Sequence, residues 1–397
     1  MNSLRIVRNA EGVNGVTLSN HSVLLVENKE DTWNGFNYQR YFMYNLESNT
    51  KTEIAPNIPK LNVIEIRDIN RYPEYIYFSN FHCDGDDIEI RIFRYSIQEK
   101  NCKNIYTIKD SLSKYQNTLK TKIFILNEFY MLIQNEMLRS NLKENYEGYL
   151  DFELSMFNIL QSETIRIADE NLNANGISDI KLISENVCVL KSGYSLLKEE
   201  RYKYLEKEEV SVESISFVYL GQLVSDIIIS KSNIVMNTIE QTFYTTTIPY
   251  FKVKGNYLIY SKYNFEEKEE TVVYYNYLTK ESYVCINKTE NEDIILAKTI
   301  IFNEKPYIMV ETVSGIEFYN ILDKKTDFVF RESDKFEYAV NDIIIGSSEK
   351  KGLFGRKRKY INVYKYPGVS LVHSEKGKFI GCIVNDNDKI YILTKKG

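Results

Sequence analysis

Apolar and polar residues alternate along most of this chain with a period of two, which is the pattern of a β-strand with one buried face. Residues 88–92, for example, alternate isoleucine with glutamate or arginine. The period of 3.6 that is typical of helices is rare, so an array of helical repeats is excluded. Only residues 195–209 and 111–119 have a helix-like composition, and both lie between predicted strand pairs. The pattern predicts an all-β protein.

A second regularity is an aromatic residue near the end of an extended apolar run, followed by a few polar residues and another apolar run. It recurs seven times at intervals of roughly 45 to 60 residues. The aromatic residues are Tyr44, Tyr95, Phe157, Tyr219, Tyr275, Tyr319 and Tyr364. We expect these rings to pack between neighbouring repeats. Four of them are followed by an asparagine that favours a turn, namely Asn45, Asn158, Asn276 and Asn320.

Each repeat contains up to four short predicted strands separated by turn residues. The clearest has its strands at 61–67, 75–78, 88–92 and 105–108. A repeat of this length with four antiparallel strands resembles the β-propeller architecture, in which each repeat is one blade. The Gly-His and Trp-Asp pairs of WD repeats and the double glycine of kelch repeats are absent from the sequence. The resemblance is therefore to the architecture and implies no particular family.

The number of blades follows from how the ends of the chain are assigned. Seven aromatic signatures favour seven blades. Eight is the alternative, because residues 378–384 and 389–394 form a strand pair beyond the seventh signature. We expect Leu4–Arg8 to pair with these strands, since pairing of the termini closes a propeller and removes exposed sheet edges. Residues 1–397 then form a single propeller domain with a charged, helix-like insertion at about 193–210.

Composition narrows the class of protein but not its function. The chain of 397 residues is 43% hydrophobic and 26% charged, which is typical of a soluble folded protein. Its net charge of −5 argues against nucleic acid as the main partner. The five cysteines are far apart and are expected to be reduced and buried. Because neither a secretory leader nor an apolar span of membrane length is seen, we expect a cytoplasmic protein without a membrane span.

The connections between strands predict that one face of the ring carries the function. Connections from second to third strands and from fourth to first strands leave from the same face, and in this sequence they are long and dissimilar. Loops of this kind on a rigid scaffold are common binding sites. The most distinctive is the basic segment 350–359, in which two glycines and the Leu353–Phe354 pair lie between two clusters of cations. The predicted partner-binding residues are Trp33, Leu353, Phe354, Arg356, Lys357, Arg358 and Lys359.

Three hypotheses for function follow. The first is a non-catalytic interaction or scaffold propeller that binds another protein, acidic at the contact, through the long-loop face. The alternative is an enzyme, a hydrolase or lyase acting on a sugar or a small ester in the central channel. The third is binding of nucleic acid or an anionic surface through residues 350–359. The sequence contains no recognisable catalytic or metal-binding motif, so no catalytic residue, metal or cofactor is predicted.

Overall fold

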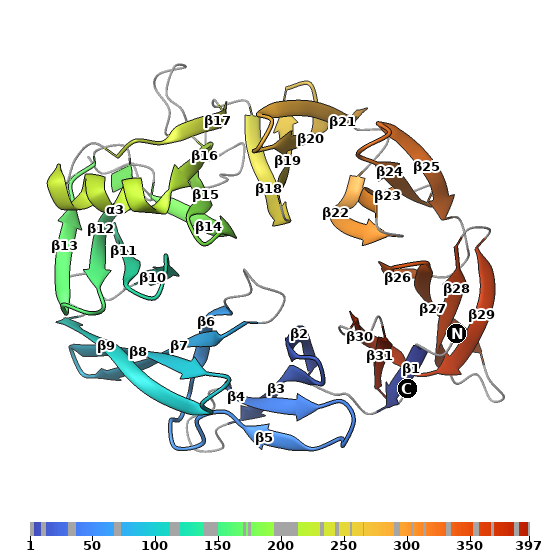
Figure 1. The fold of residues 1–397 in the computed structure, drawn as a ribbon, viewed down its shortest axis with the longest axis horizontal. Helices are drawn as coiled ribbons and strands as arrows, with labels where there is room; N and C mark the ends of the chain where they lie inside the picture. The colour runs from blue at the N-terminus through green and yellow to red at the C-terminus, as the bar shows by residue number, and fades with distance from the viewer. Residues whose placement is uncertain are drawn as a thin grey trace.

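The computed structural model describes residues 4–8, 13–30, 37–66, 73–111, 120–138, 150–169, 172–173, 176–193, 213–230, 234–242, 246–254, 256–264, 266–289, 294–302, 305–312, 315–330, 335–351, 357–366, 369–384 and 389–395. Within these residues the strands form eight sheets, arranged as a ring (Figure 1). The first strands lie at the inside of the ring and the last strands at its rim. The molecule is an all-β propeller, as its repeats predict.

Blades 1 to 4 follow one another along the chain and have four antiparallel strands each. Blade 1 consists of β2 (Val13–Ser19), β3 (Ser22–Glu30), β4 (Asn37–Asn45) and β5 (Lys51–Glu53). Blade 2 consists of β6 (Asn62–Ile66), β7 (Tyr75–Asp84), β8 (Asp87–Ser96) and β9 (Asn101–Ser111). Blade 3 consists of β10 (Lys120–Ile125), β11 (Tyr130–Leu138), β12 (Leu150–Asn158) and β13 (Glu163–Ile167). Blade 4 consists of β14 (Ile177–Ser184), β15 (Val187–Ser192), β16 (Glu213–Tyr219) and β17 (Asn237–Thr242).

Blades 5 to 7 repeat this plan, and blade 8 has three strands. Blade 5 consists of β18 (Thr246–Lys254), β19 (Tyr257–Asn264), β20 (Glu269–Asn276) and β21 (Glu281–Thr289). Blade 6 consists of β22 (Ile294–Phe302), β23 (Lys305–Thr312), β24 (Gly315–Asn320) and β25 (Lys325–Phe330). Blade 7 consists of β26 (Lys335–Val340), β27 (Ile343–Lys351), β28 (Lys357–Lys365) and β29 (Ser370–Lys376). Blade 8 combines β30 (Lys378–Val384) and β31 (Ile390–Lys395) with β1 (Leu4–Arg8).

The favoured count of seven blades is wrong, because the described strands form eight sheets. The N-terminal strand β1 pairs in parallel with β31, from Leu4 opposite Ile390 to Arg8 opposite Thr394. The two ends of the chain therefore share one sheet, as expected. Blade 8 lacks the aromatic signature. The signature precedes the turn from a third to a fourth strand, and the third strand of blade 8 is β1, which is not followed by a fourth strand of the same sheet.

The apolar core of the described residues lies between blades. It forms eight clusters, and each joins two neighbouring blades, including blade 8 to blade 1. Aromatic pairs cross several junctions: the rings of Phe217 and Tyr275 are 5.4 Å apart and those of Phe330 and Tyr364 are 5.6 Å apart. Large rings contribute most of the burial at such contacts. This confirms the packing role predicted for the repeated aromatic residue at Tyr275 and Tyr364.

The repeated asparagines also act as predicted. In the turn after β24, the Asn320 side-chain oxygen accepts hydrogen bonds from the backbone N–H groups of Leu322 (3.0 Å) and Asp323 (3.1 Å). The oxygens of Asn45, Asn158 and Asn276 accept equivalent bonds in their own turns. An asparagine that bonds to the backbone two and three residues ahead stabilises a tight turn.

We expect Asn320→Ala to lower the free energy of unfolding by about 2 kcal/mol, because Asn320 is fully buried and its amide also bonds to Asp323 and Asp327. Asn276→Ala is the matched control, since the same turn bonds are exposed there. Its expected cost is about 0.5–1 kcal/mol. Chemical denaturation of both variants measures the difference. Equal costs would show that burial of the side chain contributes nothing.

Blade 4 differs from the other blades in the connection after its third strand. Its third-to-fourth connection contains a helix, α3 (Leu220–Ile229), on the side of blades 3 and 4 (Figure 1). Leu220, Leu223 and Ile227 are buried and join the core cluster between these two blades. Their spacing of three and four residues is the helical one. Because the chain turns directly from β16 into this helix, the signature residue Tyr219 is exposed.

A β-bulge recurs at the inner edge of the blades. In seven of the eight described sheets the pairing of the first and second strands has a register shift. A bulge leaves backbone groups without partners in the ladder, and they must bond elsewhere. At three bulges a side chain of the preceding blade supplies the partner. At the simplest of these, the backbone N–H of Val63 in blade 2 donates to the Tyr41 hydroxyl of blade 1 over 3.2 Å.

The other two contacts of this kind hold both backbone groups of an isoleucine. Gln134 of blade 3 accepts from Ile177 N (2.6 Å) and donates to Ile177 O (3.1 Å) in blade 4. In blade 4, Glu213 accepts from Ile248 N (2.7 Å) and Lys191 donates to Ile248 O (2.6 Å) in blade 5. We call these the glutamine clamp and the ion-pair clamp. Each fixes the first strand of one blade against the second strand of the blade before it, and the ion-pair clamp also uses the third strand.

Candidate functional site

The long-loop face, which carries the second-to-third and fourth-to-first connections, differs from its prediction. Two of the second-to-third connections are largely strand. The hairpin of β7 and β8 continues beyond β6, and the hairpin of β27 and β28 continues beyond both β26 and β29. The predicted insertion at 193–210 lies outside the described residues, except for Gly193. Among the parts that the structure describes, this face therefore presents protruding hairpins rather than long irregular loops.

The predicted partner-binding residues are only partly described. Trp33, Leu353, Phe354 and Arg356 lie outside the described residues. Lys357, Arg358 and Lys359 form the start of β28, and their cross-strand neighbours are Lys351, Lys350 and Glu349. The segment is thus the end of a hairpin, with two like-charged pairs directly opposite each other. Such pairs are destabilising.

Glu349 offsets part of this repulsion. Its carboxylate lies 3.3 Å from the Lys357 ammonium and 3.4 Å from that of Lys359. Hydrogen bonds from these two lysines hold the pKa of Glu349 below its usual value. On the other face of the hairpin, Lys350 lies 5.1 Å from the ring centre of Tyr360. The hairpin is cationic and exposed, and its use as a contact surface stays a prediction.

The hairpin of blade 2 carries the opposite charge. Its tip contains Asp84, Asp86 and Asp87, all exposed, and Gly85 adopts the left-handed conformation of the turn (φ +60°). Among the described residues, no group of three or more His, Cys, Asp or Glu side chains is arranged to hold a metal ion. Asp86 instead accepts a hydrogen bond from the Ser111 hydroxyl. The segment is a charged turn.

The prediction that the cysteines are reduced and buried is confirmed only in part. Cys83, Cys102, Cys188 and Cys382 are all free thiols. Cys188 and Cys382 are buried, and burial raises the pKa of each thiol to about 12. Thiols of this kind are unreactive at neutral pH. Cys83 is exposed on the hairpin of blade 2, contrary to the expectation of buried cysteines.

The ion-pair clamp lies at the base of the connection between β15 and β16. The Lys191 ammonium is 2.9 Å from a Glu213 carboxylate oxygen, and the two side chains are 9% and 0% exposed. The Thr247 hydroxyl donates to the other oxygen over 2.7 Å. Ser192 and Ser214 add a hydrogen bond of 2.6 Å beside the pair. This arrangement holds both ends of the connection against the inner strand β18.

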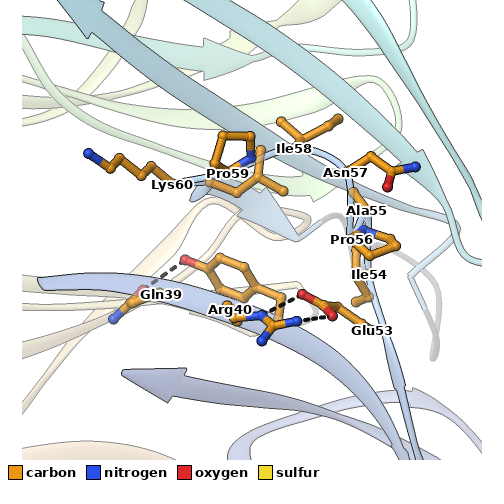
Figure 2. Close-up of a pocket in the computed structure, with 12 residues that line it drawn as sticks. Gln39, Arg40, Glu53, Ile54, Ala55, Pro56, Asn57, Ile58, Pro59 and Lys60 are labelled. Carbon is orange, nitrogen blue, oxygen red and sulfur yellow. Dashed lines mark hydrogen bonds and ion pairs between the residues drawn. The ribbon is translucent and has the colours of Figure 1, made fainter. Parts of the chain in front are cut away.

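A cavity of about 320 Å³ lies at the junction of blades 1 and 2 (Figure 2). Its walls come from the start of β4, the end of β5 and the fourth-to-first connection 54–61. Because β4 begins at the long-loop face, the cavity lies on that face. The cavity was not predicted from the sequence, in which its signal is a connection with two prolines, Pro56 and Pro59. The lining residues are Gln39, Arg40, Tyr41, Glu53, Ile54, Ala55, Pro56, Asn57, Ile58, Pro59, Lys60 and Leu61.

Polar groups of the cavity are organised around an ion pair. The Arg40 guanidinium donates two hydrogen bonds to the two oxygens of Glu53 (Figure 2). This two-pronged contact fixes both side chains in the plane of the guanidinium. The Tyr41 hydroxyl donates to Gln39 over 2.8 Å, and burial raises the pKa of this phenol. The phenol is therefore protonated at neutral pH, as its donor role requires.

Comparisons by sequence identify no relative: no family model and no curated protein matches this chain. Solved structures with a similar fold do exist. Dipeptidyl peptidase 4 of Porphyromonas gingivalis is 9% identical, with a TM-score of 0.53 over 93% of this chain and 55% of that one. The oligogalacturonate lyase of Vibrio parahaemolyticus is 9% identical, with a TM-score of 0.49 over 90% of both chains. The β-propeller domain of the Trilobed protease from Pyrococcus furiosus is 10% identical, with a TM-score of 0.45 over 88% of this chain and 93% of that one.

The ring of sheets defines the class of the molecule as a β-propeller, and the dipeptidyl peptidase structure, with its TM-score of 0.53, has a similar fold. The chain spans about half the length of the dipeptidyl peptidase that it resembles. The first functional hypothesis, a non-catalytic interaction or scaffold propeller, is contradicted, because the similar fold with a TM-score of 0.53 belongs to a peptidase. Among the described residues, no helix has the length and apolarity needed to cross a bilayer.

Proposed function

We propose that this chain is the propeller of an enzyme, a hydrolase or lyase whose substrate is a sugar, a small ester or a short peptide. The observation that carries the proposal is the eight-bladed ring, whose fold is similar to part of dipeptidyl peptidase 4 from Porphyromonas gingivalis. That protein's name supplies the peptide as a substrate class. The sugar and the ester come from the hypothesis of a substrate in the centre of the ring.

Tyr338 supports a site at the centre. It lies on β26, one of the inner strands, and is 39% exposed. Its ring centre is 6.4 Å from that of Phe379 on β30, the inner strand of the next blade. Burial of part of the side chain raises the pKa of the phenol. A phenol that stays protonated at neutral pH can donate a hydrogen bond to a substrate or to a leaving group.

The test is turnover by the purified chain. Chromogenic p-nitrophenyl esters, p-nitrophenyl glycosides and dipeptidyl p-nitroanilides represent the three substrate classes, and formation of a conjugated double bond in oligosaccharides reports lyase activity. We expect turnover above the uncatalysed rate for at least one class. Absence of turnover across the whole panel, with the chain shown to be folded, would refute the proposal.

A pair of matched variants tests whether the proposed active site includes Tyr338. Tyr338→Phe removes one hydroxyl from an inner strand, and we expect kcat to fall at least about tenfold, in the range of a lost catalytic hydrogen bond or proton transfer. Tyr283→Phe removes a hydroxyl from the outer strand β21, where it donates to Glu281 over 2.7 Å. That variant is expected to keep its activity. Equal activity of both variants would show that Tyr338 is not part of the active site.

A further inference from the structure

Two hairpins of opposite charge extend from the same face of the ring. We call residues 80–91 of β7 and β8 the acidic hairpin, and residues 348–351 and 357–360 of β27 and β28 the basic hairpin. Both join the second and third strands of their blades, so both lie at the long-loop face. The pairing of β6 with β7 ends at Ser79, and that of β26 with β27 ends at Ser347. Each hairpin therefore extends beyond the inner strand of its blade.

The basic hairpin has more charge than it can neutralise itself. Its described residues contain five cations and one carboxylate, Glu349, which lies close to two of the cations. The other three, Lys350, Lys351 and Arg358, form no ion pair with a carboxylate that the structure describes. Lys350 lies directly opposite Arg358, and Lys351 opposite Lys357. Like charges in these positions are destabilising, and carboxylates from a partner would relieve the repulsion.

The acidic hairpin has the complementary excess. Asp84, Asp86 and Asp87 are exposed, and Asp84 lies directly opposite Asp87 across the turn. Neither of these two forms an ion pair with a described cation. The same hairpin carries Phe81, whose side chain is large, apolar and 48% exposed. An aromatic side chain beside unpaired charges is typical of a surface that contacts another protein.

The positions of the two hairpins in the ring allow two copies of the chain to satisfy each other. Blades 7, 8, 1 and 2 follow one another round the ring, so blades 2 and 7 are equally far in order from the junction of blades 8 and 1 (Figure 1). A two-fold axis in the plane of the long-loop face, through this junction, exchanges the positions of blades 2 and 7. It therefore places the acidic hairpin of each copy against the basic hairpin of the other, and the contact forms twice.

We propose that the long-loop face binds a second copy of this chain, with acidic hairpin against basic hairpin at two equivalent contacts. A second copy carries both charges at the required positions. Nucleic acid, the alternative partner for the basic hairpin, is repelled by the acidic hairpin on the same face and by the net charge of −5. The proposal concerns strand ends at the face of the ring and does not rest on the proposed enzyme activity.

The test is the mass of the full chain in solution, measured by sedimentation equilibrium over a series of protein concentrations. We expect a dimer at about 0.1 M salt and a dissociation constant at least about tenfold higher at about 1 M, because the Debye length falls from about 10 Å to about 3 Å. The expected species is a closed dimer, since a two-fold axis leaves no hairpin free to bind a third copy.

Charge reversal tests which residues form the contact. One variant combines Lys350→Glu, Lys351→Glu and Arg358→Glu, and a second combines Asp84→Lys, Asp86→Lys and Asp87→Lys. Each variant alone sets like charges against each other at both contacts, and we expect its dimer to be at least about a hundredfold weaker. An equimolar mixture of the two variants restores opposite charges at both contacts, so we expect it to form a heterodimer.

A third variant is the matched control. Lys100→Glu, Lys280→Glu and Lys324→Glu make the same change of net charge in exposed turns between third and fourth strands, on the opposite face of the ring. We expect this variant to dimerise like the unmodified chain. Thermal unfolding verifies that all the variants are folded.

Four results would overturn the proposal. They are a chain that is monomeric at the lower salt concentration, open assemblies of more than two copies, a reversed variant that dimerises as well as the control, and a mixture of the two reversed variants that stays monomeric. Poly-glutamate and duplex DNA are added to the unmodified chain as probes for other partners. A monomeric chain that binds either of them through the basic hairpin would assign this hairpin to that partner instead.

Discussion

Lys191→Met is expected to lower the free energy of unfolding by about 3–5 kcal/mol, the largest effect we predict for a single substitution. The substitution removes the cation from the ion-pair clamp and leaves the Glu213 carboxylate in a site where its side chain is fully buried. It also removes the hydrogen bond to Ile248 O at the bulge of β18. An unpaired buried charge is far more costly than a missing pair. Chemical denaturation of the variant measures the loss.

The double variant Lys191→Met, Glu213→Gln separates charge from packing. Glutamine keeps an oxygen that can accept from Ile248 N or from the Thr247 hydroxyl but carries no charge. We expect the double variant to recover at least about half of the lost stability, because removal of both charges from a buried pair is often nearly neutral. If the double variant is as unstable as Lys191→Met alone, the loss comes from packing rather than from an unpaired charge.

Gln134→Leu is expected to cost about 2–4 kcal/mol, because it leaves two buried backbone groups of Ile177 without their partners. Leucine has a similar volume and suits an apolar surrounding, so little of the effect comes from a cavity. Gln241→Leu, at an exposed position of the outer strand β17, is the matched control and is expected to change stability by less than about 0.5 kcal/mol. A cost for Gln134→Leu as small as the control would mean that Ile177 finds other partners.

Much of the fold could be predicted from the sequence, because the strands have an alternating pattern and the turns have their own chemistry. The turn asparagines and the repeated aromatic residues predicted the hairpins and the packing between blades. The three strands of the last blade and their pairing were also predicted, but the count of blades was wrong, because this blade lacks the aromatic signature by which the blades were counted. The helix α3 escaped because Tyr219 matched the strand signature, although Leu220, Leu223 and Ile227 have helical spacing.

The candidate sites were harder to predict, for a physical reason. The clamps join side chains to backbone groups, and any residue type presents the same backbone, so Ile177 and Ile248 carry no sign of their role. The cavity depends on positive φ angles at Ala55 and Lys60, which are residues that seldom adopt them. The basic segment was noticed for its charge, but the alternation of its residues did not reveal that it continues two strands.

The parallel pairing of β1 with β31 has a consequence for the order of events during synthesis. Among the strands of the propeller β1 is synthesised first, and its partner β31 (Ile390–Lys395) is synthesised last. Blades 1 to 7 draw all their strands from local sequence and can form as the chain emerges, whereas blade 8 can form only afterwards. Until then the nascent array is an open arc with an uncovered edge at each end. Closure of the ring must therefore wait until β31 has been synthesised and can pair with β1.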